Sequence, residues 1–453
     1  MVLERRPQWT RRAFLTSWIV ICLKFCVSVA AHTSSSYPQF QEQQPSRLVL
    51  VQMLFRHGDR SPISVYPTDP NGAAVWQQGL GQLTQVGMKQ AYNYGKELRQ
   101  RYIGPGILPP NYNRSEVYVR STDVDRTIMT AQSLLTGLYP SNFSDWEFGT
   151  WQPIPVHMES GNSDQLFGHA MCPQLEKVKR EWQSRSEKFL NFHARNKMLY
   201  DVLSSHTGMN VAGENVGGIA DTVFCETQHN MTQPAWLTQN IHTKLMEVRN
   251  QATELAFAAS GTARLFAGPL LADIISNMEQ KAKNGSAYKL LLFSAHDSTV
   301  IGLSSAMGVF NNLHPPYLCS IIIELFQQGG NFFVRTLFHN HSAEVPYNMT
   351  VHGCPIMCPL EQFSDLLQDQ ILPSKDRAVA CAESKSVSDI LKQNAIPALV
   401  GAVMVLIALI VCVTYKLVKL KKQQRQTNLR YRQLLQENGE VETDDEEDLE
   451  SAS

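Results

Sequence analysis

The sequence predicts an α/β fold: a mixed, mostly parallel central sheet with helices on both faces, an inserted α-helical subdomain and one C-terminal transmembrane helix. Three apolar segments have strand-like patterns, and each ends in charged residues followed by a turn or a helix start. From about 161 to 284, strand-like patterns are scarce and helical spacing prevails. Ligands bind beyond the carboxyl ends of strands in open α/β sheets, so the three charged strand ends predict one common site.

The first predicted strand is the apolar run Leu48–Phe55, which leads directly into Arg56-His57-Gly58-Asp59-Arg60-Ser61-Pro62. Arginine offers planar donor forks that match phosphate oxygens, and its charge disfavours protonation of the neighbouring histidine. An unprotonated imidazole is free to act as a nucleophile, so this heptapeptide predicts phosphoryl transfer through histidine. The alternative is a plain surface turn after a strand, because glycine, aspartate, serine and proline are all common turn residues.

The next elements follow the same pattern of strand, charged end and helix. Thr84 is a candidate cap for a helix to about Tyr102. The second strand, Glu116–Val119, ends at Arg120, and capping residues then precede a helix predicted over Asp125–Leu138. Helix amino termini add partial positive charge at such a strand end, which favours an anionic ligand there.

The third strand, Tyr288–Ser294, ends at Ala295-His296-Asp297, and Ser298 and Thr299 can open another helix. A carboxyl group beside a bound phosphate can give a proton to a departing alkoxide. Taken alone, His296 and Asp297 also fit a buried hydrogen-bonded pair.

Both ends of the chain predict passage into a membrane. Residues 1–31 have a basic start, an apolar centre and small residues at the end, the pattern of a cleaved secretory signal. Residues 395–415 contain no charged residue and are long enough to span a bilayer as a helix. Basic residues follow at once, as on a cytoplasmic flank. We therefore expect a single-pass type I protein with a lumenal part over 32–394 and a cytoplasmic tail over 416–453.

Composition agrees with a globular lumenal domain, because 43% of the residues are hydrophobic, 18% are charged and the formal net charge is -1. This balance gives no indication of nucleic-acid binding. Six cysteines fall in the lumenal part, which predicts three disulfides in an oxidising compartment, although zinc binding is a competing interpretation of Cys354 and Cys358. Candidate N-glycosylation sites are Asn113, Asn142, Asn230, Asn284, Asn340 and Asn348.

Three motifs in order resemble those of the histidine acid phosphatases, specifically the lysosomal, prostatic and testicular group. They are the heptapeptide at Arg56, the segment Val117–Thr127 with its Arg120-Ser121-Thr122-Asp123 core, and Ser294-Ala295-His296-Asp297-Ser298-Thr299. The resemblance covers about Arg47 to Cys381. It implies a lumenal phosphatase with an α/β core at about 47–160 and 285–381 and a helical subdomain at about 161–284.

By this resemblance, His57 is the nucleophile that forms a phosphohistidine and Asp297 is the acid that protonates the leaving group. The phosphate oxygens are held by Arg56, Arg60, Arg120 and His296, and no metal or other cofactor is implied. The resemblance also implies the disulfides Cys172–Cys381, Cys225–Cys319 and Cys354–Cys358. Cys319 stands two residues after Tyr317, where the family usually has three, and a shift of one residue on a strand reverses the face of a side chain.

The predicted tail contains Tyr431-Arg432-Gln433-Leu434, which fits the tyrosine-x-x-apolar pattern read by endocytic adaptors. The alternative is that Tyr431 and Leu434 lie on a helix next to the membrane. We expect a lysosomal or plasma-membrane location, an adaptor at the tail and a homodimer.

The predicted function is hydrolysis of phosphate monoesters through a covalent phosphohistidine. Two alternatives stay open: an inositol-phosphate phosphatase of the same superfamily, and a catalytically idle, receptor-like ectodomain. The complete set of proposed catalytic residues argues against idleness.

Overall fold

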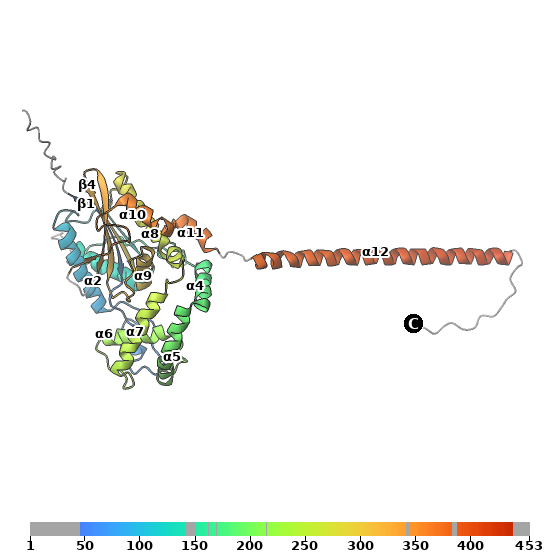
Figure 1. Ribbon diagram of the computed structural model, residues 1–453, viewed down its shortest axis with the longest axis horizontal. Coiled ribbons are helices and arrows are strands. Elements are labelled where there is room, and N and C mark those ends of the chain that lie inside the picture. The colour runs from blue at the N-terminus through green and yellow to red at the C-terminus, as the bar shows by residue number, and fades with distance from the viewer. Residues whose placement is uncertain are drawn as a thin grey trace, which may run out of the picture. The chain divides into compact units, whose positions relative to one another are not determined.

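The computed structural model describes residues 46–141, 151–161, 163–168, 170–213, 215–340, 345–382 and 387–437. The chain divides into two compact units, one up to Ala382 and one from Glu383 onward. The predicted signal sequence at 1–31 and the sequon at Asn142 lie outside the described residues. Figure 1 shows the first unit as a sheet layer flanked by helices, with a further group of helices at one end.

The central sheet is mixed, as the sequence predicts. Its order is β2-β3-β1-β4-β5-β6, and β7 pairs with β5. β1 (Arg47–Arg56), β2 (Val117–Ser121) and β3 (Leu290–Ala295) are mutually parallel neighbours. β4 (Ser320–Gln328), β5 (Asn331–His339), β6 (Tyr347–Asn348) and β7 (Cys358–Pro359) pair antiparallel. Antiparallel pairings thus outnumber parallel ones among the described strands. The sheet is mixed as predicted, but the expectation that most of its pairings are parallel is wrong.

Helices cover both faces of the sheet, which explains why β1 is an almost unbroken apolar run. Alternate β1 side chains, including Val51 and Phe55, pack with α2 (Gln85–Leu98) and α3 (Asp125–Leu138) in one core. Leu50 and Leu54 point into the other core, which contains residues of three helices: α8 (Thr262–Ala282), α9 (Asp297–Ala306) and α10 (Leu360–Leu367). α3 has the bounds that the sequence predicts, and Thr84 caps α2 by accepting from the Gly87 N–H.

A separate apolar core joins α5 (Glu187–Thr207), α6 (Val216–Gln228) and α7 (Gln239–Leu255). These helices gather at one end of the unit in Figure 1. α4 (Pro173–Arg185) precedes them, and Ser186 ends α4 and caps α5. Because α8 packs against the sheet, we propose that the inserted subdomain ends before α8, earlier than the expected boundary near 284.

Two of the three expected disulfides are present, Cys172–Cys381 and Cys354–Cys358. The first ties the start of α4 to α11 (Ser374–Cys381). The third is a correction: Cys225 and Cys319 are both free and buried. Cys319 lies in the core beside the sheet, while Cys225 Sγ is 3.2 Å from the hydroxyl of Tyr317. The shortened spacing thus places the tyrosine, instead of the cysteine, opposite α6.

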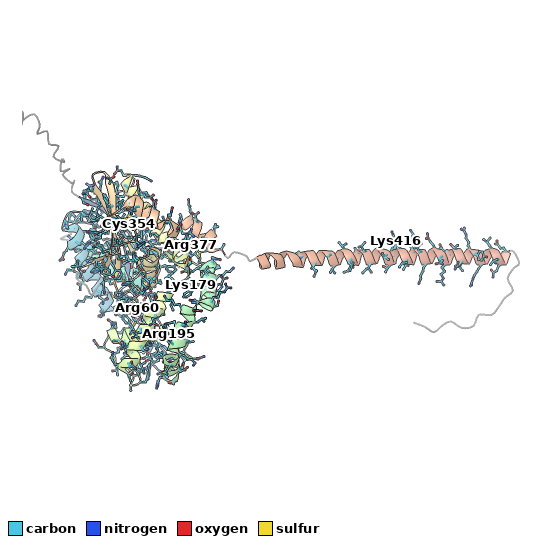
Figure 2. All side chains as sticks on the ribbon, viewed as in Figure 1. Arg60, Lys179, Arg195, Cys354, Arg377 and Lys416 are labelled. Carbon is cyan, nitrogen blue, oxygen red and sulfur yellow. A yellow bond between two sulfur atoms is a disulfide. The ribbon has the colours of Figure 1, made fainter. Side chains whose placement is uncertain are left out.

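The second unit contains α12 (Val387–Glu437), a helix long and apolar enough to cross a membrane, with a mean hydropathy of 2.4 in its most apolar window. Side chains such as Lys416 stand out along it in Figure 2. The expected span at 395–415 lies within it. α12 continues through Tyr431 and Leu434, so the adaptor-like motif lies on a helix.

Four described sequon asparagines are exposed: Asn113, Asn230, Asn284 and Asn348. Asn340 is half-buried. Their occupancy stays a prediction.

Candidate active site

The carboxyl ends of the three parallel strands meet at one place. Arg56, the last residue of β1, is in register with Ala295, the last residue of β3, and Ser121 of β2 is in register with Ser294. Loop residues that follow each strand therefore converge, as the charged strand ends predict. The helix α2 comes very close to the loop after β1, since a Cβ on Gly58 would lie 2.6 Å from the carbonyl oxygen of Gly87. Glycine at both positions permits this contact.

His57 is buried, with 1% of its surface exposed, and its ring orientation is fixed by a backbone contact. Nδ1 lies 2.9 Å from the carbonyl oxygen of Gly58, which can only accept a hydrogen bond. Nδ1 therefore carries the proton and Nε2 keeps its lone pair. Burial, followed by the charges of Arg56 and Arg60, lowers the pKa of His57 well below its usual value. The neutral form of the imidazole, which is the nucleophilic form, is thus favoured.

Three arginines near His57 have buried donors with no acceptor. The Nε atoms of Arg56, Arg60 and Arg126 each lack a hydrogen-bond partner among the described residues. An unpaired buried donor costs on the order of 1–3 kcal/mol, and more on a charged group, so such groups are rare unless a ligand or water pairs with them. Three in one place indicate the site of an oxyanion.

Arg126 was not among the expected phosphate ligands, although it lies in the second motif. It occupies the first turn of α3, and its Nη2 is 3.2 Å from Nδ1 of His296. The other ring nitrogen of His296 is 3.0 Å from the hydroxyl of Thr122. Burial, and then the charge of Arg60, lower the pKa of Arg126 to about 10, so its positive charge is poorly compensated by the surrounding residues. The sequence signal that could have identified Arg126 is its position at a helix start directly after a charged strand end.

Arg120 is a correction. It shares a sheet face with Tyr118, because side chains alternate along β2, and its guanidinium lies 5.7 Å from the ring centroid of Phe167. It forms ion pairs of 3.1 Å with the buried Asp164 and 3.4 Å with Glu159. The guanidinium of Arg120 thus pairs with these two acids beside the sheet. Arg126, in its place, contacts His296 in the candidate site.

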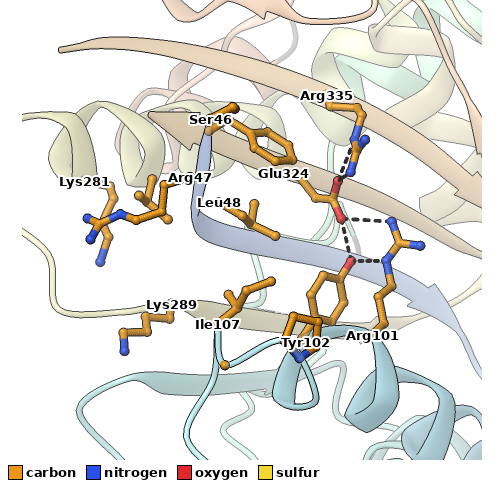
Figure 3. Close-up of a pocket in the computed structure, with 14 residues that line it drawn as sticks. Ser46, Arg47, Leu48, Arg101, Tyr102, Ile107, Lys281, Lys289, Glu324 and Arg335 are labelled. Atoms are coloured by element: carbon orange, nitrogen blue, oxygen red, sulfur yellow. Dashed lines mark hydrogen bonds and ion pairs between the residues drawn. The ribbon is translucent and has the colours of Figure 1, made fainter. Parts of the chain in front are cut away.

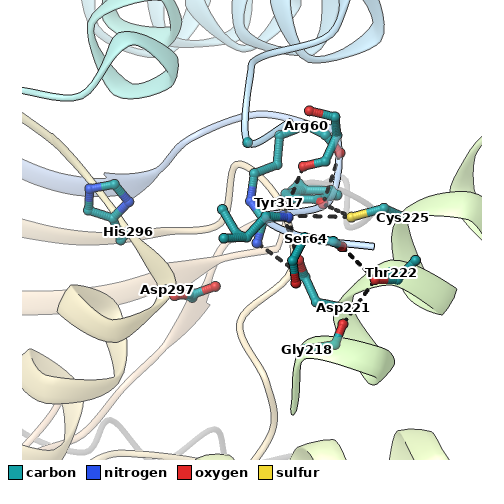
Figure 4. Close-up of polar contacts among 12 residues, drawn as sticks. Arg60, Ser64, Gly218, Asp221, Thr222, Cys225, His296, Asp297 and Tyr317 are labelled. Atoms are coloured by element: carbon teal, nitrogen blue, oxygen red, sulfur yellow. Dashed lines mark hydrogen bonds and ion pairs between the residues drawn. The ribbon is translucent and has the colours of Figure 1, made fainter. Parts of the chain in front are cut away.

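Arg60 is held from the helical subdomain, as Figure 4 shows. Both of its terminal nitrogens lie 2.9 Å from the carboxylate oxygens of Asp221 on α6. Burial raises the pKa of Asp221, but Arg60 reverses this effect and the net pKa is lowered. The sequence carried no signal for Asp221, because the pairing depends on how α6 packs against the loop after β1.

Asp297 begins α9 and faces Arg56 at an ion-pair distance of 2.9 Å. Nε2 of His314 lies 3.4 Å from the same carboxylate oxygen. Burial acts to raise the pKa of Asp297, yet Arg56 and then His314 hold it well below the usual value. The charged form of Asp297 is therefore favoured, and its side chain keeps 24% of its surface exposed.

A cavity of about 790 Å³ lies elsewhere, at the opposite end of β1. Figure 3 shows its lining, in which Arg101 and Arg335 both pair with the buried Glu324. None of the candidate active-site residues lines this cavity, so a cavity by itself does not identify the reactive site.

The family follows from comparison with known proteins. The model of the histidine phosphatase superfamily (branch 2) matches residues 47–339. The chain belongs to this superfamily. It is 39% identical to lysosomal acid phosphatase of Xenopus laevis over 81% of this chain and 86% of the relative. It is 37% identical to human prostatic acid phosphatase over 75% of this chain and 89% of that relative.

Solved structures with the same fold include two bacterial phytases. The Hafnia alvei enzyme is 19% identical with a TM-score of 0.59, covering 73% of this chain and 98% of that one. The Citrobacter braakii enzyme is 18% identical with a TM-score of 0.58, covering 75% and 100%. At this identity the likeness establishes the α/β fold alone. The lysosomal relatives and the apolar α12 fit a lysosomal or membrane location.

Proposed function

We propose that this protein is an acid phosphatase that hydrolyses phosphate monoesters through a phosphohistidine at His57. The observation that carries the proposal is the set of buried, unpaired Nε–H donors of Arg56, Arg60 and Arg126 around a neutral imidazole. A phosphoryl group needs chiefly positioning and compensation of charge on its equatorial oxygens, and three guanidiniums with His296 supply both.

In the first step, Nε2 of His57 attacks phosphorus and the bond from phosphorus to the ester oxygen breaks. That oxygen takes the proton of Asp297 and leaves as an alcohol. In the second step, water attacks the phosphohistidine, Asp297 takes a proton from the water, and the phosphorus–nitrogen bond breaks to release phosphate.

The acid role of Asp297 requires a proton, whereas the charges around it favour its ionised form. A bound phosphate competes for Arg56 and places negative charge beside the carboxylate, and both effects raise the pKa of Asp297. Substrate binding therefore favours uptake of a proton, most readily at acidic pH. Proton uptake on substrate binding therefore explains how Asp297 can act as the general acid although its ionised form is favoured beforehand.

Trapping the intermediate tests the proposal. The purified protein, quenched in acid after brief exposure to labelled substrate, should carry an acid-labile, base-stable phosphoryl group on a peptide containing His57. His57→Ala should carry none, although circular dichroism should show an unchanged fold. Label retained by His57→Ala would overturn the assignment.

The ends of the chain support a type I topology, with the phosphatase unit lumenal and residues 416–453 cytoplasmic. Protease added to sealed vesicles whose outer face is the cytoplasmic one would test it, because only the tail should then be cleaved.

We also propose an endocytic adaptor at Tyr431 and Leu434. Both side chains are exposed on α12, at 64% and 55%, so a partner can reach them. Tyr431→Ala should then slow internalisation.

The expected homodimer is a further proposal, which sedimentation of the lumenal unit would test.

A further inference from the structure

A fourth arginine, Arg249 of α7, approaches the proposed site from the helical subdomain. Its guanidinium carbon lies 4.1 Å from the ring centroid of Phe224, and that ring is 5.5 Å from the ring of Tyr317. The guanidinium carbon of Arg56 lies 4.4 Å from the ring centroid of Tyr317. A continuous series of contacts between two cations and two aromatic rings therefore connects Arg56 with Arg249 of α7. Cation–π contacts of this kind fix the orientation of a guanidinium while leaving its N–H edges free to donate.

The charge of Arg249 is not neutralised by an ion pair. Arg56 has Asp297 and Arg60 has Asp221, but no carboxylate among the described residues lies within ion-pair distance of Arg249. Burial, and then the charge of Arg56, lower the pKa of Arg249 to about 10. A half-buried cation that the protein leaves uncompensated is well suited to an anion from outside.

α7 is also linked, through His314, to the residue proposed to protonate the leaving group. The side-chain oxygen of Asn250 accepts a hydrogen bond of 3.1 Å from the backbone N–H of His314. The hydroxyl of Thr253 is 3.1 Å from Nδ1 of His314, and Nε2 of the same ring approaches Asp297. A leaving group protonated by Asp297 therefore departs on the side of the site that α7 borders.

We propose that Arg249 forms a second anion subsite, which selects phosphate monoesters whose alcohol portion carries its own negative charge, such as a carboxylate or a second phosphate. This inference rests on the proposed phosphatase function and specifies its substrate class. Arg249 is a specificity residue in this scheme: it contacts the leaving group and has no part in the transfer of the phosphoryl group.

Matched substrate pairs test the subsite. Each pair consists of an alkyl phosphate that ends in a carboxylate and its uncharged carboxamide, with spacers of one to four methylenes. The two members have nearly the same size, so the ratio of their kcat/KM values reports charge recognition. We expect the wild-type protein to favour the carboxylate by about tenfold or more at the best spacer length, which corresponds to about 1.4 kcal/mol.

Arg249→Gln should bring the ratio close to one, and Arg249→Lys should restore part of it. The control is Arg195→Gln, which removes an exposed arginine from α5 of the same subdomain and should keep the wild-type ratio. A wild-type ratio near one at every spacer would overturn the subsite. So would an Arg249→Gln variant that slows both members equally, because Arg249 would then act on the reacting phosphate or on the fold.

The same pairs as non-hydrolysable phosphonates separate this inference from the proposed function. Calorimetry should show the carboxylate preference in binding to the wild-type protein and its loss in Arg249→Gln, even if turnover does not proceed through His57. Absence of a trapped phosphohistidine would contradict the proposed function alone, and equal binding of carboxylate and carboxamide would contradict the subsite alone.

Discussion

Arg56 and Arg377 have the same chemistry and the same burial, since neither exposes any of its surface, yet their surroundings differ. All three guanidinium nitrogens of Arg377 on α11 have acceptors, among them the carbonyl of Leu265 and the side chain of Gln165. Arg56 has an ion pair and one carbonyl contact, and its Nε has no acceptor. A satisfied buried arginine stabilises the fold, whereas an unsatisfied one keeps donors ready for a ligand.

The largest effect is expected at Asp297, the acid paired with the unsatisfied arginine. Asp297→Ala should slow hydrolysis of alkyl phosphates by about 10² to 10⁴, because their alkoxides need a proton to leave. Hydrolysis of nitrophenyl phosphate should fall much less, and the phosphohistidine should still form. Equal slowing of both substrates in steady-state assays would show that Asp297 positions phosphate or supports the fold instead.

Arg126 and Arg120 sharpen the comparison within one motif. Arg126→Ala should lower kcat/KM by about 10² to 10³, the usual cost of removing one preorganised donor from a developing oxyanion. Arg120→Met removes a guanidinium that pairs with Asp164 and should lower stability while the rate per folded molecule stays near wild type. Kinetics normalised to the folded fraction of each variant would separate the two effects. The reverse ranking would restore Arg120 as the phosphate ligand.

Arg377→Met should lower the stability of the fold and leave kcat nearly unchanged, the opposite of what a catalytic substitution does. It leaves at least three buried carbonyl or amide oxygens without their donor, and each unsatisfied group costs about 1–3 kcal/mol. We therefore expect the free energy of unfolding to fall by about 3 kcal/mol or more in urea titrations, with little change in kcat of the folded fraction. A large loss of kcat at unchanged stability would break the distinction between the two arginines.

Glu226 extends the comparison to a buried acid and gives the smallest effect. It is fully buried on α6 and accepts from Asn71 at 2.9 Å. Burial, with a further contribution from Asp69, raises the pKa of Glu226 to about 7. The folded protein therefore binds this proton more tightly than the unfolded chain, and the resulting stability is present at low pH and lost as pH rises through 7.

Between pH 5 and pH 7.5 this difference amounts to about 2 kcal/mol in favour of the acidic condition. Glu226→Gln should flatten the dependence of unfolding free energy on pH in that window. A wild-type protein with the same stability at both values, or a variant with the same slope as wild type, would contradict the assignment to Glu226.

The sequence alone determined the features that depend on neighbouring residues. β1 is an apolar run because both of its faces are covered, α3 begins and ends where its pattern predicts, and the segments around His57 and Asp297 lie at strand ends. These predictions succeed because strand and helix periods and the flanking arginines are local properties, which the chain carries in consecutive residues.

The tertiary structure decided which distant groups meet. Arg120 and Arg126 belong to one motif, but the alternation of β2 turns Arg120 to Asp164 while the first turn of α3 carries Arg126 to His296. Asp221, Arg249 and His314 reach the site only through the packing of α6, α7 and the loop after α9. Cys225 and Cys319 stay apart because Cys319 packs in the core beside the sheet, whereas Cys225 faces the hydroxyl of Tyr317. Such contacts join residues far apart in the chain, and no local pattern specifies their geometry.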